Sequence, residues 1–267
     1  MTADCDAVRN KLREMFGGVV GGKHGYSVPD ITHFLCHKIG ENWLVTAPDK
    51  SVTDVAKLRT NNGSGNIACF CSNASRDVII SFLGSDSIAF FGGNSTYRGR
   101  ISAYMRGDNQ KLFVGDRCEI NSANFLVVGN DSQITIGDEC LLSFDVNIRT
   151  HDEHGIIDMT TGHCLNPAAD VHIEPHVWLA REVSIHGGVH IGFGSIIGER
   201  AMVKKSIPRL CMAVGTPARV IRTNVSWSNS LSPEPDLTSY LMDFEKKLGP
   251  ADLSNYKQEN GPSRQSL

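Results

Sequence analysis

The chain has 267 residues, 40% of them apolar and 21% charged, with a formal net charge of −3. These values indicate a folded protein with a sizeable core and argue against a disordered chain or a coiled coil. The near-neutral charge argues against a dedicated nucleic-acid-binding protein. No apolar run reaches about 18 residues, and segment 1–13 lacks the apolar stretch of a signal peptide, so we expect no membrane span and no secretion signal.

Residues 1–65 contain no repeat that we detect. Residues 7–16 are compatible with a helix and residues 54–59 with a further helical turn. The glycine-rich segment 83–113, with its scattered aliphatic residues, is expected to form the irregular first coils of the repeat that follows. The eight cysteines include no Cys-x-x-Cys pair, which favours reduced thiols in a cytoplasmic protein.

A repeat of six residues dominates the second half of the chain. A helix repeats every 3.6 residues and a strand every two, so a period of six predicts a short strand, a corner and another short strand. We expect the leading aliphatic residues to point inward and the residues four positions later to lie near corners. The leading positions are Ile173, Leu179, Ile185, Ile191, Ile197 and Val203, followed by Val177, Val183, Val189, Ser195, Ala201 and Ile207. Shorter runs with the same period begin at Val114 and Ile136, with a slip of phase between residues 126 and 136.

Two segments interrupt or follow the repeat. Residues 150–170 are rich in glycine, asparagine, proline and charge, which indicates a loop that leaves the repeat. After residue 221, the polar stretch 226–235 resembles a linker. Apolar residues at helical spacing then predict a helix from Leu237 to Leu248 with Asp236 as its N-cap, and residues 249–267 are expected to be disordered.

The period of six resembles the hexapeptide repeat of left-handed β-helix acyltransferases. The resemblance implies an all-β, left-handed parallel β-helix whose coils stack about 4.8 Å apart. It divides the chain into a mixed N-terminal cap (1–65), the β-helix acyltransferase domain (66–222, with external loop 150–170) and a C-terminal region (223–267) that contains the helix. Most members of this family are homotrimers that bind coenzyme A between neighbouring prisms, which implies the same assembly here.

The loop and the hexad after it most resemble enzymes that modify sugars of bacterial surface polysaccharides. This resemblance implies that His151 is a general base, which takes the proton of a sugar hydroxyl as it attacks a thioester. An imidazole can accept a proton near neutral pH. The resemblance also implies that Trp178 lies beside the thioester and that the backbone N–H of Arg181 stabilises the oxyanion.

The last repeats resemble the family's segments that bind acetyl-CoA. They read Ile-Gly-Glu-Arg-Ala-Met-Val-Lys-Lys-Ser-Ile-Pro at 197–208 and Gly-Thr-Pro-Ala-Arg-Val-Ile-Arg at 215–222. The cations between 204 and 222, with no acidic residue among them, suit the phosphates of the coenzyme. The residues implied are Ala180, Glu199, Lys204, Lys205, Gly215, Pro217, Arg219 and Arg222; Ala180, Glu199 and Arg200 depart from the family's usual Gly, Ala and Gly.

The resemblance also implies that the carbohydrate acceptor contacts Asn121 and Asn124. His154 and His163 are either further acceptor contacts or ordinary histidines of the loop. We expect no metal site, because the histidine pairs at 172/176 and 186/190 are four residues apart and lie on different parts of a coil. The zinc enzymes of this fold use a spacing that is absent here.

The leading hypothesis is therefore an acetyl-CoA-dependent O-acetyltransferase acting on a cell-surface polysaccharide or its precursor. The alternatives are an N-acetyltransferase of a nucleotide-linked amino sugar and a non-catalytic solenoid scaffold.

Overall fold

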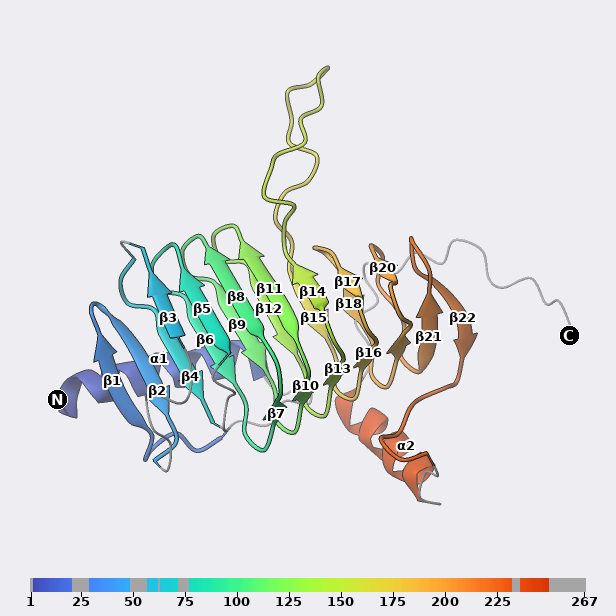
Figure 1. Ribbon diagram of the computed structural model, residues 1–267, viewed down its shortest axis with the longest axis horizontal. Helices are drawn as coiled ribbons and strands as arrows, with labels where there is room; N and C mark the ends of the chain where they lie inside the picture. The colour runs from blue at the N-terminus through green and yellow to red at the C-terminus, as the bar shows by residue number, and fades with distance from the viewer. Residues whose placement is uncertain are drawn as a thin grey trace, which may run out of the picture.

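The chain folds into a parallel β-solenoid with three sheets around one apolar core (Figure 1). The computed structural model describes residues 2–20, 29–48, 57–61, 63–71, 77–231 and 236–249. Each coil runs from sheet A to sheet C, then to sheet B and back to sheet A. Neighbouring strands pair in parallel, except for the antiparallel pairs β1–β2 and β21–β22 at the two ends of the described solenoid.

The strands are two to six residues long, and most of those in sheet C have only two residues. Sheet A consists of β1 (Leu35–Ile39), β2 (Asn42–Thr46), β4 (Ile67–Phe70), β6 (Ile88–Phe91), β9 (Lys111–Val114), β12 (Gln133–Ile136), β15 (Val171–Ile173) and β18 (His190–Ile191). Sheet B consists of β3 (Lys57–Thr60), β5 (Val78–Phe82), β8 (Ile101–Arg106), β11 (Ala123–Val128), β14 (Val146–Arg149), β17 (Ser184–Ile185) and β20 (Met202–Val203). Sheet C consists of β7 (Thr96–Tyr97), β10 (Glu119–Ile120), β13 (Leu141–Leu142), β16 (Trp178–Leu179), β19 (Ile196–Ile197), β21 (Cys211–Val214) and β22 (Arg219–Thr223).

The two series of the six-residue repeat form the core, which confirms the predicted fold. The leading aliphatic residues from Ile173 to Val203 are fully buried, and the second series from Val177 to Ile207 is at most 4% exposed. Burial of these side chains along the axis provides the main favourable free energy of folding.

Coil length explains why the repeat is visible in only part of the sequence. His172 pairs with His190, an advance of 18 residues, or three hexads. Upstream, Ile88 pairs with Lys111 and Lys111 with Gln133, advances of 23 and 22 residues. The extra residues lengthen the sheet-B strands β8 and β11 and the turns that follow them, which breaks the phase of six. Segment 83–113 does form early coils of the solenoid, but its strands β6, β7 and β8 and the start of β9 are regular rather than irregular.

The solenoid also begins earlier than the sequence indicated. Strands β2 and β3 pair in parallel with β4 and β5, so the sheets extend to the N-terminal side of the expected boundary at 65/66. Residues 57–59, expected in a helical turn, lie in β3, while residues 54–56 of that turn lie outside the described residues. The expected helix at 7–16 is confirmed as part of α1 (Thr2–Val20).

Helix α1 packs on the outer face of sheet A. The ring of Phe16 meets Phe90 edge-on, with centroids 4.9 Å apart, and Phe113 at 6.2 Å. Strands β6 and β9 are therefore apolar on both faces, which hides the alternation by two that an exposed strand would show.

Helix α2 (Leu237–Leu248) docks near the end of sheet A and confirms the predicted C-terminal helix. Phe244 stacks on Phe193 with ring centroids 5.3 Å apart. The Arg209 guanidinium donates to both carboxylate oxygens of Glu174 and to the carbonyl oxygen of Gly249, 2.6 Å away. Asp236 occupies the predicted N-cap position, and its carbonyl oxygen accepts from the Tyr240 N–H, but its side chain makes no capping hydrogen bond.

The external loop leaves the solenoid between β14 and β15 and projects far from it (Figure 1). The Ala169 N–H donates to the Thr150 carbonyl oxygen at 3.0 Å, which closes the base of the loop. The next coil passes close beneath, since a Cβ on Gly187 would lie 2.4 Å from that same oxygen. Only glycine allows this approach.

The Asn166 side chain holds the two arms of the loop together. Its Oδ1 accepts from the Ile156 N–H at 2.6 Å, and its Nδ2 donates to the His154 carbonyl oxygen at 2.9 Å. At the tip, Asp158 accepts from the N–H groups of Thr160 and Thr161, which lowers the pKa of this carboxyl. The loop is therefore an ordered hairpin.

The buried pair of Glu174 and Arg209 predicts a pH-dependent stability. Burial raises the pKa of Glu174, but hydrogen bonds from His190, Arg209 and the Phe193 N–H outweigh burial and lower the pKa to about 2. Because the unfolded value is about 4.3, the carboxylate stabilises the fold fully above that pH, and this stabilisation is lost as the pH falls through about 2. In urea unfolding, Glu174→Gln should cost about 3–5 kcal/mol near neutral pH. The difference in unfolding free energy between this variant and the wild type should narrow below about pH 4.

The control is Asp243→Asn, which removes one partner of an exposed ion pair and should change stability by less than about 0.5 kcal/mol. An equal effect of both variants would contradict the prediction.

The side-chain hydrogen bonds of Asn166 should keep the loop rigid. Asn166→Ala removes both hydrogen bonds between the arms, so backbone amides in residues 153–166 should exchange faster with deuterium. The control Asn10→Ala removes an exposed amide from α1 and should leave exchange in the loop unchanged. Unaltered exchange in Asn166→Ala would show that other contacts order the loop.

Candidate active site

His151 lies where β14 ends, at the corner between sheets B and A. Its Nδ1 atom is buried and has no hydrogen-bond partner among the described residues. Buried polar atoms normally find a partner, so this imidazole is incompletely satisfied within one chain. Next to it, the Oδ1 of Asp152 lies 3.6 Å from the Nδ1 of His186.

His186 adds an imidazole that the sequence interpretation did not assign to the site. It follows β17 in the coil after the loop, in axial line with Arg149 of β14 and Lys204 after β20. Burial lowers the pKa of His186, the positive charges of Arg149 and Lys204 lower it further, and Asp152 opposes them. The side chain is therefore neutral near physiological pH.

Trp178 and Arg181 lie elsewhere on the prism. Trp178 is half-buried on sheet C, and Arg181 follows at the corner between sheets C and B, where its side chain pairs with Glu182 at 3.1 Å. The backbone N–H of Arg181 has no acceptor among the described residues. Within one chain, the structure thus does not bring His151 together with Trp178 and Arg181.

The C-terminal segment covers one side of Trp178, a contact that the sequence did not reveal. Trp227 stacks on His176 with ring centroids 4.5 Å apart and lies 6.1 Å from Trp178. Its Nε1 donates to the His176 carbonyl oxygen at 2.8 Å. A single tryptophan in a polar stretch gave no signal of this long-range packing.

The residues expected to bind the coenzyme divide among different parts of the prism. Ala180, Glu199 and Gly215 lie on the corner between sheets C and B in successive coils, with Pro217 in the turn after Gly215. Lys204 and Lys205 follow β20 at the corner of sheets B and A, on the side of His186. Arg219 and Arg222 are exposed on β22. Arg209, which completes the basic run, is held by Glu174.

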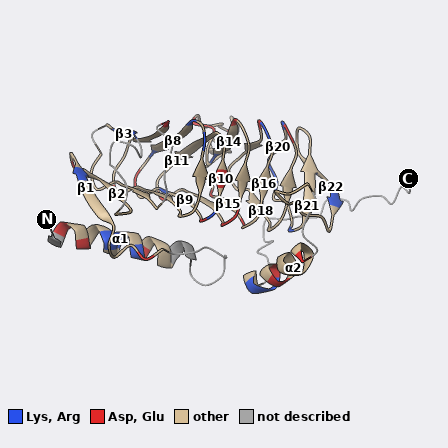
Figure 2. Cartoon of the chain, turned by 60° about the horizontal axis from the view of Figure 1, so that its bottom comes forward, with Lys and Arg blue, Asp and Glu red and all other residues tan. Residues whose placement is uncertain are grey.

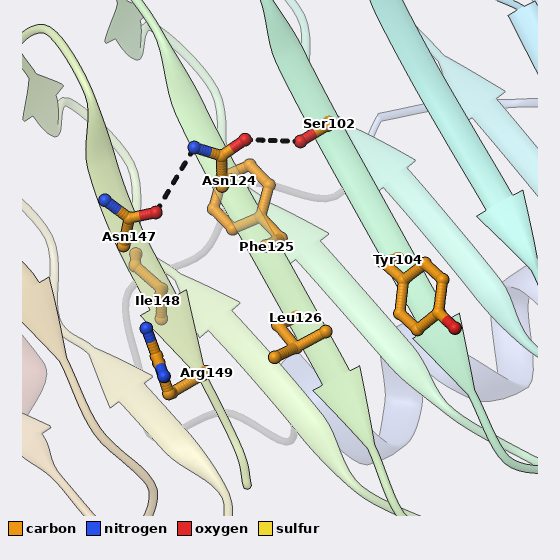
Figure 3. Close-up of a pocket in the computed structure, with 8 residues that line it drawn as sticks. All are labelled: Ser102, Tyr104, Asn124, Phe125, Leu126, Asn147, Ile148 and Arg149. Carbon is orange, nitrogen blue, oxygen red and sulfur yellow. Dashed lines mark hydrogen bonds between the residues drawn. The ribbon is translucent and has the colours of Figure 1, made fainter. Parts of the chain in front are cut away.

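The residues expected to contact the acceptor also separate. Asn124 points outward from sheet B and lines a pocket of about 200 Å³ together with Ser102, Tyr104, Leu126, Asn147 and Arg149 (Figure 3). Asn121 lies at the corner between sheets C and B, while His154 and His163 are exposed on the external loop.

Three further observations concern metals, thiols and membranes. No group of three or more His, Cys, Asp or Glu side chains in the described ranges is arranged to hold a metal ion. All eight cysteines are free thiols. Among the helices that the structure describes, none is long and apolar enough to cross a membrane.

Comparison with known proteins finds relatives that are named as acetyltransferases, although no family model matches the chain. The chain is 34% identical over 137 residues to a polysialic acid O-acetyltransferase of Escherichia coli O1:K1, a match covering 51% of this chain and 43% of that protein. It is 29% identical over 136 residues to a putative lipopolysaccharide biosynthesis O-acetyl transferase of Escherichia coli K12, covering 46% of this chain and 64% of that one. The chain thus spans less than half the length of the first of these relatives.

The fold comparison extends the similarity beyond the matched sequence. A crystal structure of a polysialic acid-specific acetyltransferase superposes with a TM-score of 0.59 and 26% identity, covering 78% of this chain and 94% of that one. A second polysialic acid O-acetyltransferase shares the fold with a TM-score of 0.50 and 23% identity, covering 70% of this chain and 99% of the other. The chain is a left-handed β-helix protein with hexapeptide repeats and a relative of the hexapeptide-repeat acyltransferases, resembling those that acetylate bacterial polysaccharides.

Proposed function

We propose that this protein is an acetyl-CoA-dependent O-acetyltransferase that modifies a sugar hydroxyl of a capsular or other cell-surface polysaccharide or its precursor. The observation that carries the proposal is His151, a partly satisfied imidazole at the base of an ordered loop, on a solenoid shared with a polysialic acid-specific acetyltransferase. The names of the relatives support the reaction and the class of acceptor. The free thiols fit a reaction in the cytoplasm.

His151 acts as the general base in this proposal. Its imidazole takes the proton of the sugar hydroxyl as the oxygen attacks the thioester carbonyl, and then returns the proton to the departing sulfur. The new C–O bond replaces the C–S bond, so the products are an acetyl ester and coenzyme A. No covalent intermediate on the protein is needed.

The corner between sheets C and B supplies the complementary groups. The unpartnered N–H of Arg181 stabilises the oxyanion that forms on the carbonyl oxygen. Backbone groups around Ala180, Glu199 and Gly215 line the path of the pantetheine arm. Arg219 and Arg222 on β22, and Lys204 and Lys205 at the corner between sheets B and A, bind the phosphates.

The site forms between two chains of a homotrimer in this proposal. His151 and Trp178 lie on different sides of one prism, so each needs the other from a neighbouring copy. The external loop supports such a contact, because Ile156, Met159 and Leu165 are 55%, 93% and 61% exposed on it. Clustered exposed apolar side chains mark interaction surfaces.

Loss of the base should abolish most turnover. His151→Ala should lower acceptor-dependent release of thiol from acetyl-CoA by roughly 10²–10⁴-fold, the usual contribution of a general base. The panel of acceptors contains polysaccharides and nucleotide-linked amino sugars, since a response only to the latter would indicate N-acetylation instead. His163→Ala and His154→Ala, exposed on the same loop, are the comparison variants. Full activity of His151→Ala would refute the role of His151. If His154→Ala alone lost activity, the base would be His154 instead.

Mixing of inactive variants tests the site between chains. His151→Ala and Trp178→Ala proteins should each have low activity, and refolding them together should restore a substantial fraction, because some interfaces then hold both native residues. Refolding each variant alone provides the control. Without recovery in a mixture shown to exchange chains, the site would lie within one chain.

A further inference from the structure

The outer face of sheet B carries two rows of side chains in axial register. Ser102, Asn124 and Asn147 occupy equivalent positions on β8, β11 and β14. Two residues further along each strand, the second row consists of Tyr104, Leu126 and Arg149. The close-up in Figure 3 shows both rows along the pocket.

The first row is a directional chain of hydrogen bonds. Ser102 donates to the Oδ1 of Asn124, the Nδ2 of Asn124 donates to the Oδ1 of Asn147 at 3.2 Å, and the Nδ2 of Asn147 donates to the Asp145 carbonyl oxygen at 2.9 Å. Each asparagine amide has two N–H donors and uses one here. The row is thus held rigid and still presents a spare N–H donor on the two asparagine rungs, which lie about 4.8 Å apart.

Charge on this face has one sign. The described strands of sheet B contain the cations Lys57, Arg59, Arg106 and Arg149 and no acidic residue. The guanidinium of Arg149 forms no hydrogen bond or ion pair with any described residue. Helices α1 and α2 both lie on the opposite side of the solenoid (Figure 2). The described helices therefore leave this face free for a ligand, and its basic side chains are complementary to negative charge.

The second row leads directly to the corner that holds His151. Along the axis it continues from Arg149 to His186 and then to Lys204. Tyr104, at its other end, is half-buried and presents an aromatic ring to the pocket (Figure 3). Aromatic rings with nearby hydrogen-bond donors suit the apolar faces and hydroxyl groups of sugars.

From this arrangement we infer that the outer face of sheet B binds several consecutive units of an acidic glycan, laid along the solenoid axis towards His151. Arg149 pairs with a carboxylate of the glycan, the spare N–H donors of Asn124 and Asn147 bind hydroxyl or carboxylate oxygens, and the ring of Tyr104 packs against a sugar. The inference rests on the proposed function for its ligand class, but the binding itself requires no acetyl transfer.

Binding of fluorescent polysialic acid oligomers, measured by anisotropy without acetyl-CoA, tests the inference. Affinity for the native protein should rise with oligomer length, because longer chains reach more rungs, and should fall as salt is raised. Arg149→Gln should weaken binding about tenfold, the loss expected for one charge-assisted hydrogen bond. The double variant Tyr104→Ala/Asn124→Ala should remove the dependence on length.

The matched control is Lys111→Gln, which removes the same charge from the outer side of sheet A. It should bind like the native protein, and neutral dextran should not bind to either. Equal weakening by Lys111→Gln and Arg149→Gln would show general charge attraction and overturn the inference. Native affinity of the double variant for the glycan would also overturn the inference. If the sedimentation coefficient of that variant changed at the same time, the face would instead be a contact between copies of the chain. The binding assay contains no acetyl-CoA and involves no acetyl transfer. A protein that binds the glycan in a length-dependent way but releases no thiol would therefore refute the proposed function and leave the binding face intact.

Discussion

Hydrogen bonding between successive coils is the constraint on which the rest of this structure depends. Each strand pairs in parallel with its equivalent in the next coil, so equivalent residues stack in columns along the axis. Arg149, His186 and Lys204 form one such column. Arg181, Glu199 and Gly215 form another, at the corner between sheets C and B. A residue's chemistry is thus combined with that of residues one coil away, rather than with its neighbours in sequence.

The same constraint keeps the columns apart. The prism is filled by close-packed aliphatic side chains, so its corners cannot move towards each other. His151 and Trp178 therefore stay on different sides of a chain, and the external loop is the described segment that projects from the prism far enough to reach another copy (Figure 1). The buried, unpartnered Nδ1 of His151 is consistent with a site that a second chain completes.

The three faces of the prism are used differently. Sheet A is covered by α1 through Phe16, and α2 docks beside its end through Phe244 and the Arg209–Glu174 pair. Sheet B bears polar and basic side chains in register, and neither of the described helices covers it (Figure 2). Covering one face stabilises the solenoid, because it buries outward-facing Phe90 and Phe113. The uncovered face carries the groups that the inferred glycan needs.

The sequence by itself determined the solenoid, the loop at 150–170 and both helices, because 18-residue coils and amphipathic helices express their geometry as local periods. It did not reveal the coils of 22 and 23 residues, whose longer sheet-B strands and following turns erase the period of six. It grouped Arg209 with the other cations of the basic run, although Glu174 pairs with it from 35 residues away. Only the tertiary structure decided which candidate residues share a corner, because that depends on the length of every coil between them.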